Sequence, residues 1–372
     1  MTKKSKGENK KHNTNDSALI VNPGIEQPSS INQAAINRIK QRKNTLLTTE
    51  QYFEGILQHN IMILSKAITL VESSLPKHRE IAHQLIDKCL PYTGNSIRIG
   101  ITGVPGVGKS TFIEALGSTI TGTGHKLAVL AIDPSSERSK GSILGDKTRM
   151  ETLSADKNAY IRPSPSAGSL GGVARKTRET VMLCEAAGFD TIFIETVGVG
   201  QSEVAVHSMV DFFLLLMLAG AGDELQGIKR GIMEMADMIA ITKADGNNID
   251  KAKLAQAEYK NALHLYPPTE SGWIPCVETC SSVTKNGVNN VWQIINQYVD
   301  FTRKNGYFLK RRQQQSKYWI YETINESLHT RFFNDEKVQS KLADLEKQVL
   351  NNKLSSFAAA QILLDTFTGN KE

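Results

Sequence analysis

One glycine-rich segment has the residue types and spacing of a phosphate-binding loop. Residues 103–111 read Gly-Val-Pro-Gly-Val-Gly-Lys-Ser-Thr, which matches the pattern G-x-x-x-x-G-K-[ST]. They follow the mainly apolar run 98–102 and precede a helical stretch that starts near Lys109. Glycines let backbone amides turn toward phosphate oxygens at a helix N-terminus, where amide dipoles favour anions. We therefore predict that the phosphates of a nucleotide contact Gly103, Val104, Pro105, Gly106, Val107, Gly108, Lys109, Ser110 and Thr111.

Acidic residues elsewhere have the positions expected of a magnesium site. Glu195 ends the run 191–194 and opens Glu-Thr-Val-Gly, a D-x-x-G pattern with Glu in place of Asp. Asp133 follows the run 127–132, and Asp146 lies in Gly-Asp-Lys-Thr-Arg at 145–149. Three carboxylates at one sheet edge repel one another unless a divalent cation lies between them. We predict that Mg²⁺ is held by Ser110, Asp133, Asp146 and Glu195. The alternative is that Asp133 or Asp146 only caps a helix or a turn.

A second motif predicts which base is bound. Residues 242–245 read Thr-Lys-Ala-Asp after the apolar run 238–241, the form of the guanine motif N-K-x-D with Thr for Asn. Asp245 would accept hydrogen bonds from the N1–H and exocyclic amine of guanine, and adenine would leave that carboxylate unpaired. The Lys243 stem would pack on the base, and the loop 280–283 would back the guanine carbonyl. The predicted base-binding residues are Thr242, Lys243, Asp245, Ser281, Ser282 and Val283, and the predicted ligands are GTP and GDP.

The same residues predict hydrolytic chemistry. Lys109 is placed to reach the β- and γ-phosphates, and we assign catalysis to Lys109, Asp133 and Glu195. Small Ras-like GTPases place a water-orienting Gln directly after D-x-x-G. Here Val199 has that position and Gln201 comes two residues later. We therefore expect slow hydrolysis that a partner could accelerate.

Strand and helix patterns alternate around these motifs. Helical stretches separate most of the apolar runs that predict strands at 97–102, 127–132, 159–162, 191–195, 212–218, 238–242 and 274–278. That rhythm is typical of βαβ units with right-handed crossovers. We predict an α/β fold, a P-loop NTPase with a mostly parallel sheet.

The chain divides into four predicted regions: a disordered basic tail at 1–30, an N-terminal helical extension at 31–92, the P-loop domain at 93–304 and a C-terminal helical region at 305–372. In the last region, apolar residues recur every four positions at Ile320, Ile324, Leu328 and Phe332. A 4-3-4 spacing follows at Val338, Leu342, Leu345 and Val349. Such stripes predict either a face docked on the chain's own domain or a helix pairing across a subunit interface.

Charge and cysteine use narrow the function classes. Residues 1–43 carry nine Lys and Arg against three Asp and Glu, whereas the remainder holds 35 of each sign. The body therefore lacks the basic surface expected for nucleic-acid binding. No apolar run approaches the roughly 20 residues needed to cross a bilayer, and the first 43 residues show no secretory pattern. The four cysteines show no disulfide framework. We predict a cytoplasmic protein that binds neither nucleic acid nor membrane.

Five segments carry a resemblance to a known family. They are the phosphate loop 103–111, Ala-Ile-Asp-Pro-Ser-Ser at 131–136, Gly-Ser-Ile-Leu-Gly-Asp-Lys-Thr-Arg at 141–149, Glu-Thr-Val-Gly-Val-Gly-Gln-Ser-Glu at 195–203 and Ala-Gly-Ala-Gly-Asp-Glu-Leu-Gln-Gly-Ile-Lys at 219–229. Together they resemble the MeaB-type GTPases of the SIMIBI class, which older descriptions call arginine/ornithine (LAO/AO) transport ATPases or kinases. The resemblance covers about residues 45–368. The last segment is the most family-specific, because ordinary GTPases have no such loop.

The resemblance implies a GTPase core with an N-terminal helical extension and a C-terminal dimerisation arm, hence a homodimer. It implies a complex with B12-dependent methylmalonyl-CoA mutase that gates delivery of adenosylcobalamin and protects the cofactor; an adenosyltransferase is a further candidate partner. Lys109, Ser110, Asp133, Asp146 and Glu195 then look like the phosphate and magnesium residues. Residues 219–229 resemble a switch loop that reports the nucleotide state to the mutase. The long basic N-terminus and Thr242 depart from the family pattern.

Other function classes fit the residues less well. A small-molecule kinase would need a charged acceptor pocket, and Arg175, Lys176 and Arg178 read as easily as a solvated helix face. A nickel-insertion GTPase would need a Cys/His relay cluster, which the sequence lacks. A pure interaction scaffold would not need an intact phosphate loop. The predicted function is a GTP-binding and GTP-hydrolysing chaperone of the mutase.

Overall fold

The computed structural model describes residues 46–133, 150–165, 170–196, 202–220 and 230–369. The chain separates into two units, Met1–Leu46 and Leu47–Glu372, and every element described below lies in the second unit. The predicted tail 1–30, the predicted ligand Asp146 and most of the predicted switch loop 219–229 lie outside the described residues. The predicted boundaries of the four regions stay predictions.

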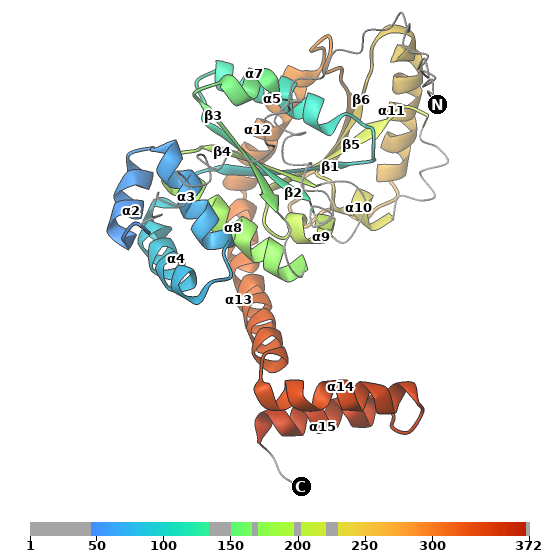
Figure 1. Cartoon of the computed structure of the whole chain (residues 1–372). Coiled ribbons are helices and arrows are strands. Elements are labelled where there is room, and N and C mark those ends of the chain that lie inside the picture. Colours follow the sequence, from blue (N-terminus) through green and yellow to red (C-terminus); the bar gives the residue numbers. More distant parts are fainter. Residues whose placement is uncertain (1–45, 134–149, 166–169, 197–201, 221–229, 370–372) are drawn as a thin grey trace, which may run out of the picture. The chain divides into compact units, whose positions relative to one another are not determined.

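A seven-stranded sheet forms the centre of the second unit (Figure 1). The strand order is β3-β2-β4-β1-β5-β6-β7, and all neighbouring strands run parallel. The strands are β1 (Ile97–Gly103), β2 (Leu127–Asp133), β3 (Ala159–Pro165), β4 (Thr191–Thr196), β5 (Phe212–Leu218), β6 (Met238–Thr242) and β7 (Cys276–Thr279). The predicted P-loop α/β fold is confirmed.

The seventh strand begins two residues later than predicted. The sequence predicts a strand over 274–278, but β7 starts at Cys276. Pro275 has no backbone N–H to donate to a neighbouring strand, and Ile274 is 79% exposed. The strand therefore starts after the proline.

Helices cover both faces of the sheet (Figure 1). One face is covered by α5 (Lys109–Gly122), α7 (Glu151–Ala155) and α12 (Val288–Lys304); the other is covered by α8 (Leu170–Ala186), α9 (Ser202–His207) and α10 (Arg230–Met235). Helix α11 (Ile249–Leu263), after the short η2 (Gly246–Asn248), packs on β6 and β7. Because water reaches neither face, the central strands are apolar runs without alternation. Every residue of β4 is buried, as are the first six of β5.

Within the described residues, three helices precede the sheet: α2 (Thr49–Leu57), α3 (Ile61–Glu72) and α4 (Pro76–Cys89), followed by the short η1 (Leu90–Tyr92). Side-chain caps start the first two, because Thr48 accepts from the backbone of Gln51 and Asn60 accepts from that of Met62. Helix α3 buries Leu64, Ile68 and Val71 and packs on α8. The helical extension is thus joined to the core through the helix that covers β2.

Three helices end the chain: α13 (Tyr307–Phe333), α14 (Glu336–Leu350) and α15 (Ser356–Thr368). The first part of α13 packs on α8 and α12 and buries Arg311, Gln315 and Trp319. Helices α14 and α15 lie side by side (Figure 1) around a small core of their own, made by Val338, Leu345, Ala359 and Leu363. No helix among the described residues has the length and apolar character to cross a membrane.

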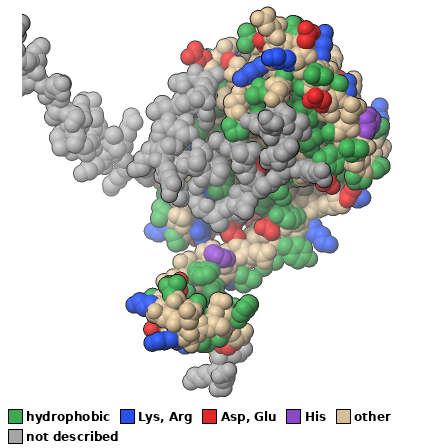
Figure 2. Space-filling model, turned by 90° about the vertical axis from the view of Figure 1, so that its right-hand side faces the viewer, with side chains coloured by type: hydrophobic (Ala, Val, Ile, Leu, Met, Phe, Trp, Pro, Cys, Tyr) green, Lys and Arg blue, Asp and Glu red, His purple; other side chains and the backbone are tan. Residues whose placement is uncertain are grey.

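The two predicted apolar stripes of this region have different roles. The 4-3-4 stripe is docked within the chain, because Val338 and Leu345 are buried against α15. On α13, Ile320, Ile324 and Leu328 remain 60%, 48% and 53% exposed. Hydrophobic side chains are visible on the surface of these C-terminal helices (Figure 2). The fourth residue of that stripe, Phe332, packs against the core of α14 and α15, with its ring 5.3 Å from that of Phe367. The first three residues of the α13 stripe are therefore left largely uncovered by the described part of the chain.

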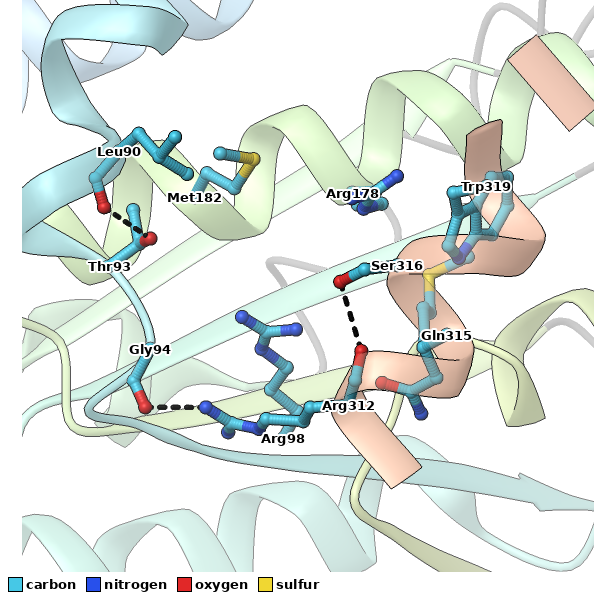
Figure 3. Close-up of a pocket in the computed structure, with 11 residues that line it drawn as sticks. Leu90, Thr93, Gly94, Arg98, Arg178, Met182, Arg312, Gln315, Ser316 and Trp319 are labelled. Carbon is cyan, nitrogen blue, oxygen red and sulfur yellow. Dashed lines mark hydrogen bonds between the residues drawn. The ribbon is translucent and has the colours of Figure 1, made fainter. Parts of the chain in front are cut away.

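Buried ion pairs hold α13 to the amino ends of the central strands. Figure 3 shows the arginines of these pairs, Arg98 and Arg312, and the hydrogen bond from Arg312 to the carbonyl oxygen of Gly94. Arg312 donates to both carboxylate oxygens of Asp211, at 2.8 and 2.7 Å, and to the carbonyl oxygens of Gly94 and Ser96. Beside it, Arg98 of β1 pairs with Glu185 at 2.9 Å. Burial alone raises the pKa of Asp211, but Arg312 outweighs it and holds that pKa below its usual value. The start of α13 is therefore fixed by charge as well as by apolar packing.

Candidate functional site

The phosphate-loop motif connects the carboxyl end of β1 to the first turn of α5. A Cβ on Gly103 would lie 2.4 Å from the carbonyl oxygen of Leu216 in β5, so only glycine fits there. Gly108 has φ +90°, a left-handed conformation that costs glycine little. Val104 and Val107 are buried and anchor the loop, whereas Pro105 and Gly106 are exposed. The loop thus has the form of an anion site at a helix N-terminus.

Lys109, the first residue of α5, lies inside this loop. Its Nζ donates to the carbonyl oxygen of Gly103 at 3.0 Å. Burial lowers the pKa of Lys109, and the negative charges of Glu195 and Glu203 act in the opposite direction. Its place in the phosphate loop at the N-terminus of α5 positions this lysine to bind a polyphosphate. Next to it, Ser110 is half-buried and Thr111 is exposed.

The structure describes the side chains of only some of the predicted metal ligands. Glu195 is 5% exposed near the end of β4, level with Ile101 of β1 and Ala131 of β2. Asp133 is the last residue of β2, at the same edge of the sheet, but its side chain lies outside the described residues, as does all of Asp146. Glu195 and Ser110 therefore belong to elements that meet at the phosphate loop, and the four-residue ligand set stays a prediction.

A buried acid that sequence reasoning did not assign to the site lies close by. Glu203, in the first turn of α9, is 1% exposed, and its charge acts on Lys109. The sequence held one signal, an acid eight residues after Glu195 within the family-like segment 195–203. That signal does not distinguish a solvated first-turn acid from a buried one. The burial of Glu203 becomes visible only in the tertiary structure, where α9 packs on β1 and β4.

The predicted guanine motif is bonded to the phosphate loop at two points. Thr242, at the end of β6, donates its hydroxyl hydrogen to the carbonyl oxygen of Val107 at 2.8 Å. Lys243 has φ +56°, and its Nζ donates to the carbonyl oxygen of Gly106 at 2.8 Å. The Thr in place of Asn therefore makes a helper hydrogen bond of its own. The two motifs, more than 130 residues apart in the chain, form one unit.

The segment after β7 supports Asp245. The hydroxyl of Ser281, which is fully buried, donates to Oδ2 of Asp245 and accepts from the backbone N–H of Thr284 at 3.1 Å. The backbone of Ala244 donates to the carbonyl oxygen of Cys280 at 3.0 Å. Ser282 is half-buried and Val283 is 81% exposed. The two segments predicted to surround guanine are thus side by side, with the Asp245 carboxylate oriented by Ser281.

This fold and site define a class. A parallel sheet with a phosphate loop after β1, a buried acid on the adjoining strand and a T-K-x-D motif after β6 is a P-loop nucleoside triphosphatase of the GTPase type. Residues 64–337 match the family model described as methylmalonyl Co-A mutase-associated GTPase MeaB. The chain belongs to the MeaB family, and it is a GTPase that binds guanine nucleotide.

Individual relatives agree with this assignment. A probable GTPase of Mycobacterium tuberculosis is 51% identical over 302 residues, which cover 81% of this chain and 90% of the relative. The mitochondrial methylmalonic aciduria type A homolog of Mus musculus is 44% identical, and the match covers 86% of this chain and 79% of the relative. The GTPase ArgK of Escherichia coli is 46% identical, and the match covers 78% of this chain and 88% of the relative. A crystal structure of an LAO/AO transport system kinase matches 87% of this chain and 100% of its own, with a TM-score of 0.69 and 36% identity.

Proposed function

We propose that this GTPase is a chaperone of B12-dependent methylmalonyl-CoA mutase that gates adenosylcobalamin loading and protects the loaded enzyme. The observation that carries the proposal is the match of residues 64–337 to a family described as mutase-associated. The mouse relative, whose name refers to methylmalonic aciduria, supports the same metabolic setting. An adenosyltransferase is a second candidate partner.

The nucleotide site supplies the switch in this proposal. Lys109 would bind the β- and γ-phosphates, and Asp245, oriented by Ser281, would accept the N1–H and amine of guanine. Ser110 and Glu195 provide hydroxyl and carboxylate oxygens, the donor types that Mg²⁺ prefers, and Asp133 and Asp146 are the further predicted ligands. When bound, Mg²⁺ would offset negative charge on the phosphates. Slow turnover alone, below about 1 s⁻¹, fits the absence of a Gln directly after the 195–198 motif.

A homodimer formed through α13 is part of the proposal. Ile320, Ile324 and Leu328 lie one turn apart on one face of the helix and stay about half exposed. A row of exposed apolar side chains with this spacing is a helix-pairing surface. A cytoplasmic location is also proposed, supported by four cysteines that are all free thiols.

The test measures GTP turnover with and without adenosylcobalamin-dependent methylmalonyl-CoA mutase. We expect the mutase to accelerate turnover by ordering the switch segments. The variant Asp223→Ala/Glu224→Ala/Lys229→Ala should keep basal turnover and GDP affinity but lose the stimulation. By linkage, the nucleotide that favours the complex must bind more tightly when the mutase is present. Equal stimulation of both proteins would reject the loop's role, and no stimulation by any acyl-CoA mutase would reject the chaperone proposal.

A further inference from the structure

A small cavity lies at the amino ends of the central strands, where β1, α8 and α13 meet (Figure 3). Its volume is about 200 Å³. The phosphate loop and the guanine motif lie at the carboxyl ends of the strands, and none of their residues lines this cavity. A seven-residue strand such as β1 spans roughly 20 Å. The cavity is therefore separate from the nucleotide site, and a molecule in it is not placed to accept phosphate from the nucleotide.

Three arginines line this cavity, each from a different element (Figure 3). They are Arg98 of β1, Arg178 of α8 and Arg312 of α13, and none of the described residues in the lining is acidic. Buried carboxylates behind the wall already pair with two of them, since Glu185 binds Arg98 at 2.9 Å and Asp211 binds Arg312 at 2.7 Å. The third arginine has no such carboxylate.

Arg178 is the arginine that remains unpaired. Within the described residues it makes no hydrogen bond or ion pair, and its guanidinium lies over the ring of Trp319, 5.7 Å from the ring centroid. The charge of Arg98 acts on Arg178 more strongly than that of Glu179, which is itself paired with Arg175 at 3.0 Å. Burial and the charge of Arg98 lower the pKa of Arg178, but a guanidinium stays protonated in proteins. The cavity therefore has one positive charge more than the carboxylates behind it offset.

The unpaired N–H groups of these arginines are accessible. Arg98 uses Nε and Nη2 on Glu185, which leaves its Nη1 without a partner. In the described part of the chain, the buried nitrogens that lack a partner include neither this atom nor any nitrogen of Arg178. Solvent therefore reaches these nitrogens, and a small molecule in the cavity can reach them as well. The hydroxyls of Thr93 and Ser316 already donate to backbone carbonyl oxygens, so the donors left for a ligand are guanidinium groups.

The rest of the lining sets the size and shape of the ligand. Its apolar side chains are Leu90, Met182, Met209 and Trp319. An apolar cavity of about 150 Å³ holds one benzene ring, so this cavity has room for one ring or a short chain together with a carboxylate. Guanidinium groups match the planar, two-oxygen geometry of a carboxylate. A phosphate dianion would bring more negative charge than the single surplus positive charge offsets.

We propose that this cavity binds a small monocarboxylate with an apolar body. The carboxylate accepts from Arg178 and from Nη1 of Arg98, and the ring or chain packs against Met182 and Trp319. The sequence is compatible with a solvated helix face for Arg178, whereas the structure places it half-buried in the wall of a cavity. The site goes beyond the proposed chaperone function and holds whether or not a mutase is the partner.

The test uses the full chain saturated with GDP, so that the nucleotide site is filled before the probe is added. The probe is benzoate, and its matched control is benzamide, which has nearly the same shape but no charge. Calorimetry and ligand-observed NMR should show benzoate binding at least about tenfold tighter than benzamide, because hydrogen bonds between ionised groups are stronger than those to a neutral amide. No binding of benzoate, or equal binding of the two compounds, overturns the proposal. Inorganic phosphate that binds more tightly than benzoate would overturn the carboxylate assignment.

Variants locate the binding. Arg178→Gln should weaken benzoate binding to the level of benzamide, while Lys176→Gln, at a half-buried position of the same helix outside the cavity, should leave it unchanged. Leu90→Glu is a second variant, at a wall position that is 57% exposed, and its negative charge should also weaken benzoate binding. If Arg178→Gln fails to fold, Leu90→Glu decides. Unchanged benzoate binding in either folded variant overturns the proposal.

Discussion

The hydroxyl of Thr242 donates to the carbonyl oxygen of Val107 at 2.8 Å, so the end of β6 is hydrogen-bonded to the middle of the phosphate loop. The bond is buried and links the part of the site that selects the base to the part that binds phosphate. A residue that departs from the usual guanine motif thus contributes to the geometry of both halves.

Removing this hydroxyl should loosen the whole nucleotide site. Thr242→Val keeps the side chain's shape but leaves the Val107 carbonyl without this donor. We expect GDP and GTP to bind about tenfold more weakly, because losing one buried hydrogen bond costs on the order of 1.4 kcal/mol. Titration with a fluorescent guanine nucleotide measures the change, and Thr242→Ser, which keeps the hydroxyl, is the control. Wild-type affinity in Thr242→Val would show that the bond does not shape the site.

Asp245 should determine base selectivity. We expect wild type to prefer GTP over ATP by about 10⁴ or more, because a site built to hydrogen-bond a missing donor rejects its analogue strongly. Asp245→Asn should move the preference toward xanthosine nucleotides, whose C2 carbonyl can accept from the amide. Ser281→Ala should weaken GDP binding without that switch, since the carboxylate remains but loses its orienting hydroxyl. Calorimetry with guanosine, adenosine and xanthosine nucleotides measures these affinities. Similar affinities of the wild type for ATP and GTP would contradict the assignment of Asp245 to base selection.

Substitutions of the phosphate-binding lysine and of the predicted metal ligands should have different effects on nucleotide binding and on the Mg²⁺ requirement. Lys109→Ala should abolish triphosphate binding, since it removes the ammonium group that lies at the Gly103 carbonyl, where the β- and γ-phosphates are expected. Glu195→Gln should still bind GTP but need on the order of tenfold more Mg²⁺ for half-maximal hydrolysis, the usual effect of losing a carboxylate that supports a metal. Asp133→Asn and Asp146→Asn should behave alike, while Glu151→Gln, at an exposed helix start, should not. Unchanged Mg²⁺ titrations in all three variants would reject the predicted ligand set.

The Arg312–Asp211 pair should make stability depend on pH in a defined direction. Arg312 holds the pKa of Asp211 below its usual 3.8, so the pair stabilises the fold above that pH and the contribution is lost as pH falls further. Arg312→Met removes the cation that is hydrogen-bonded to the buried Asp211 carboxylate, which keeps only the backbone N–H and the charge of Arg98, and should cost about 3–5 kcal/mol at pH 8. In the variant, burial raises the pKa of Asp211, so the deficit should shrink as pH falls toward 4. Urea unfolding at pH 8, 6 and 4.5 measures this, with exposed Lys310→Met as the control. A deficit that stays constant with pH would show that lost packing, not charge, is responsible.

The exposed face of α13 should hold two copies together. Wild type should sediment at about twice its 41.0 kDa mass. Ile320→Asp/Ile324→Asp/Leu328→Asp should weaken that association by at least about 100-fold, because each buried aliphatic side chain contributes about 1.5–3 kcal/mol. Lys317→Asp, also exposed on α13, should have little effect. Sedimentation that stays dimeric in the triple variant would place the interface elsewhere.

Local sequence patterns were enough to predict the class of fold and most of the strands. The phosphate loop could be recognised because its glycines meet local conformational demands, such as the left-handed φ of +90° at Gly108. Apolar runs such as 212–218 predicted buried strands, because strands covered on both faces show no alternation. The predicted strand 274–278 is wrong at its start. Its apolar residues favour a strand, but Pro275 lacks the backbone N–H that strand pairing uses.

What the sequence alone determined is therefore the chemistry that adjacent residues define: a phosphate loop, a guanine-type motif and the family they indicate. Tertiary structure decided everything that depends on residues distant in the chain. It buried Glu203 where its charge acts on Lys109, and it joined Thr242 to Val107. It also separated the two C-terminal stripes, burying Val338 on α15 and leaving Ile324 exposed. The reason is physical: periodicity shows which face of a helix is apolar, but only packing decides what covers that face.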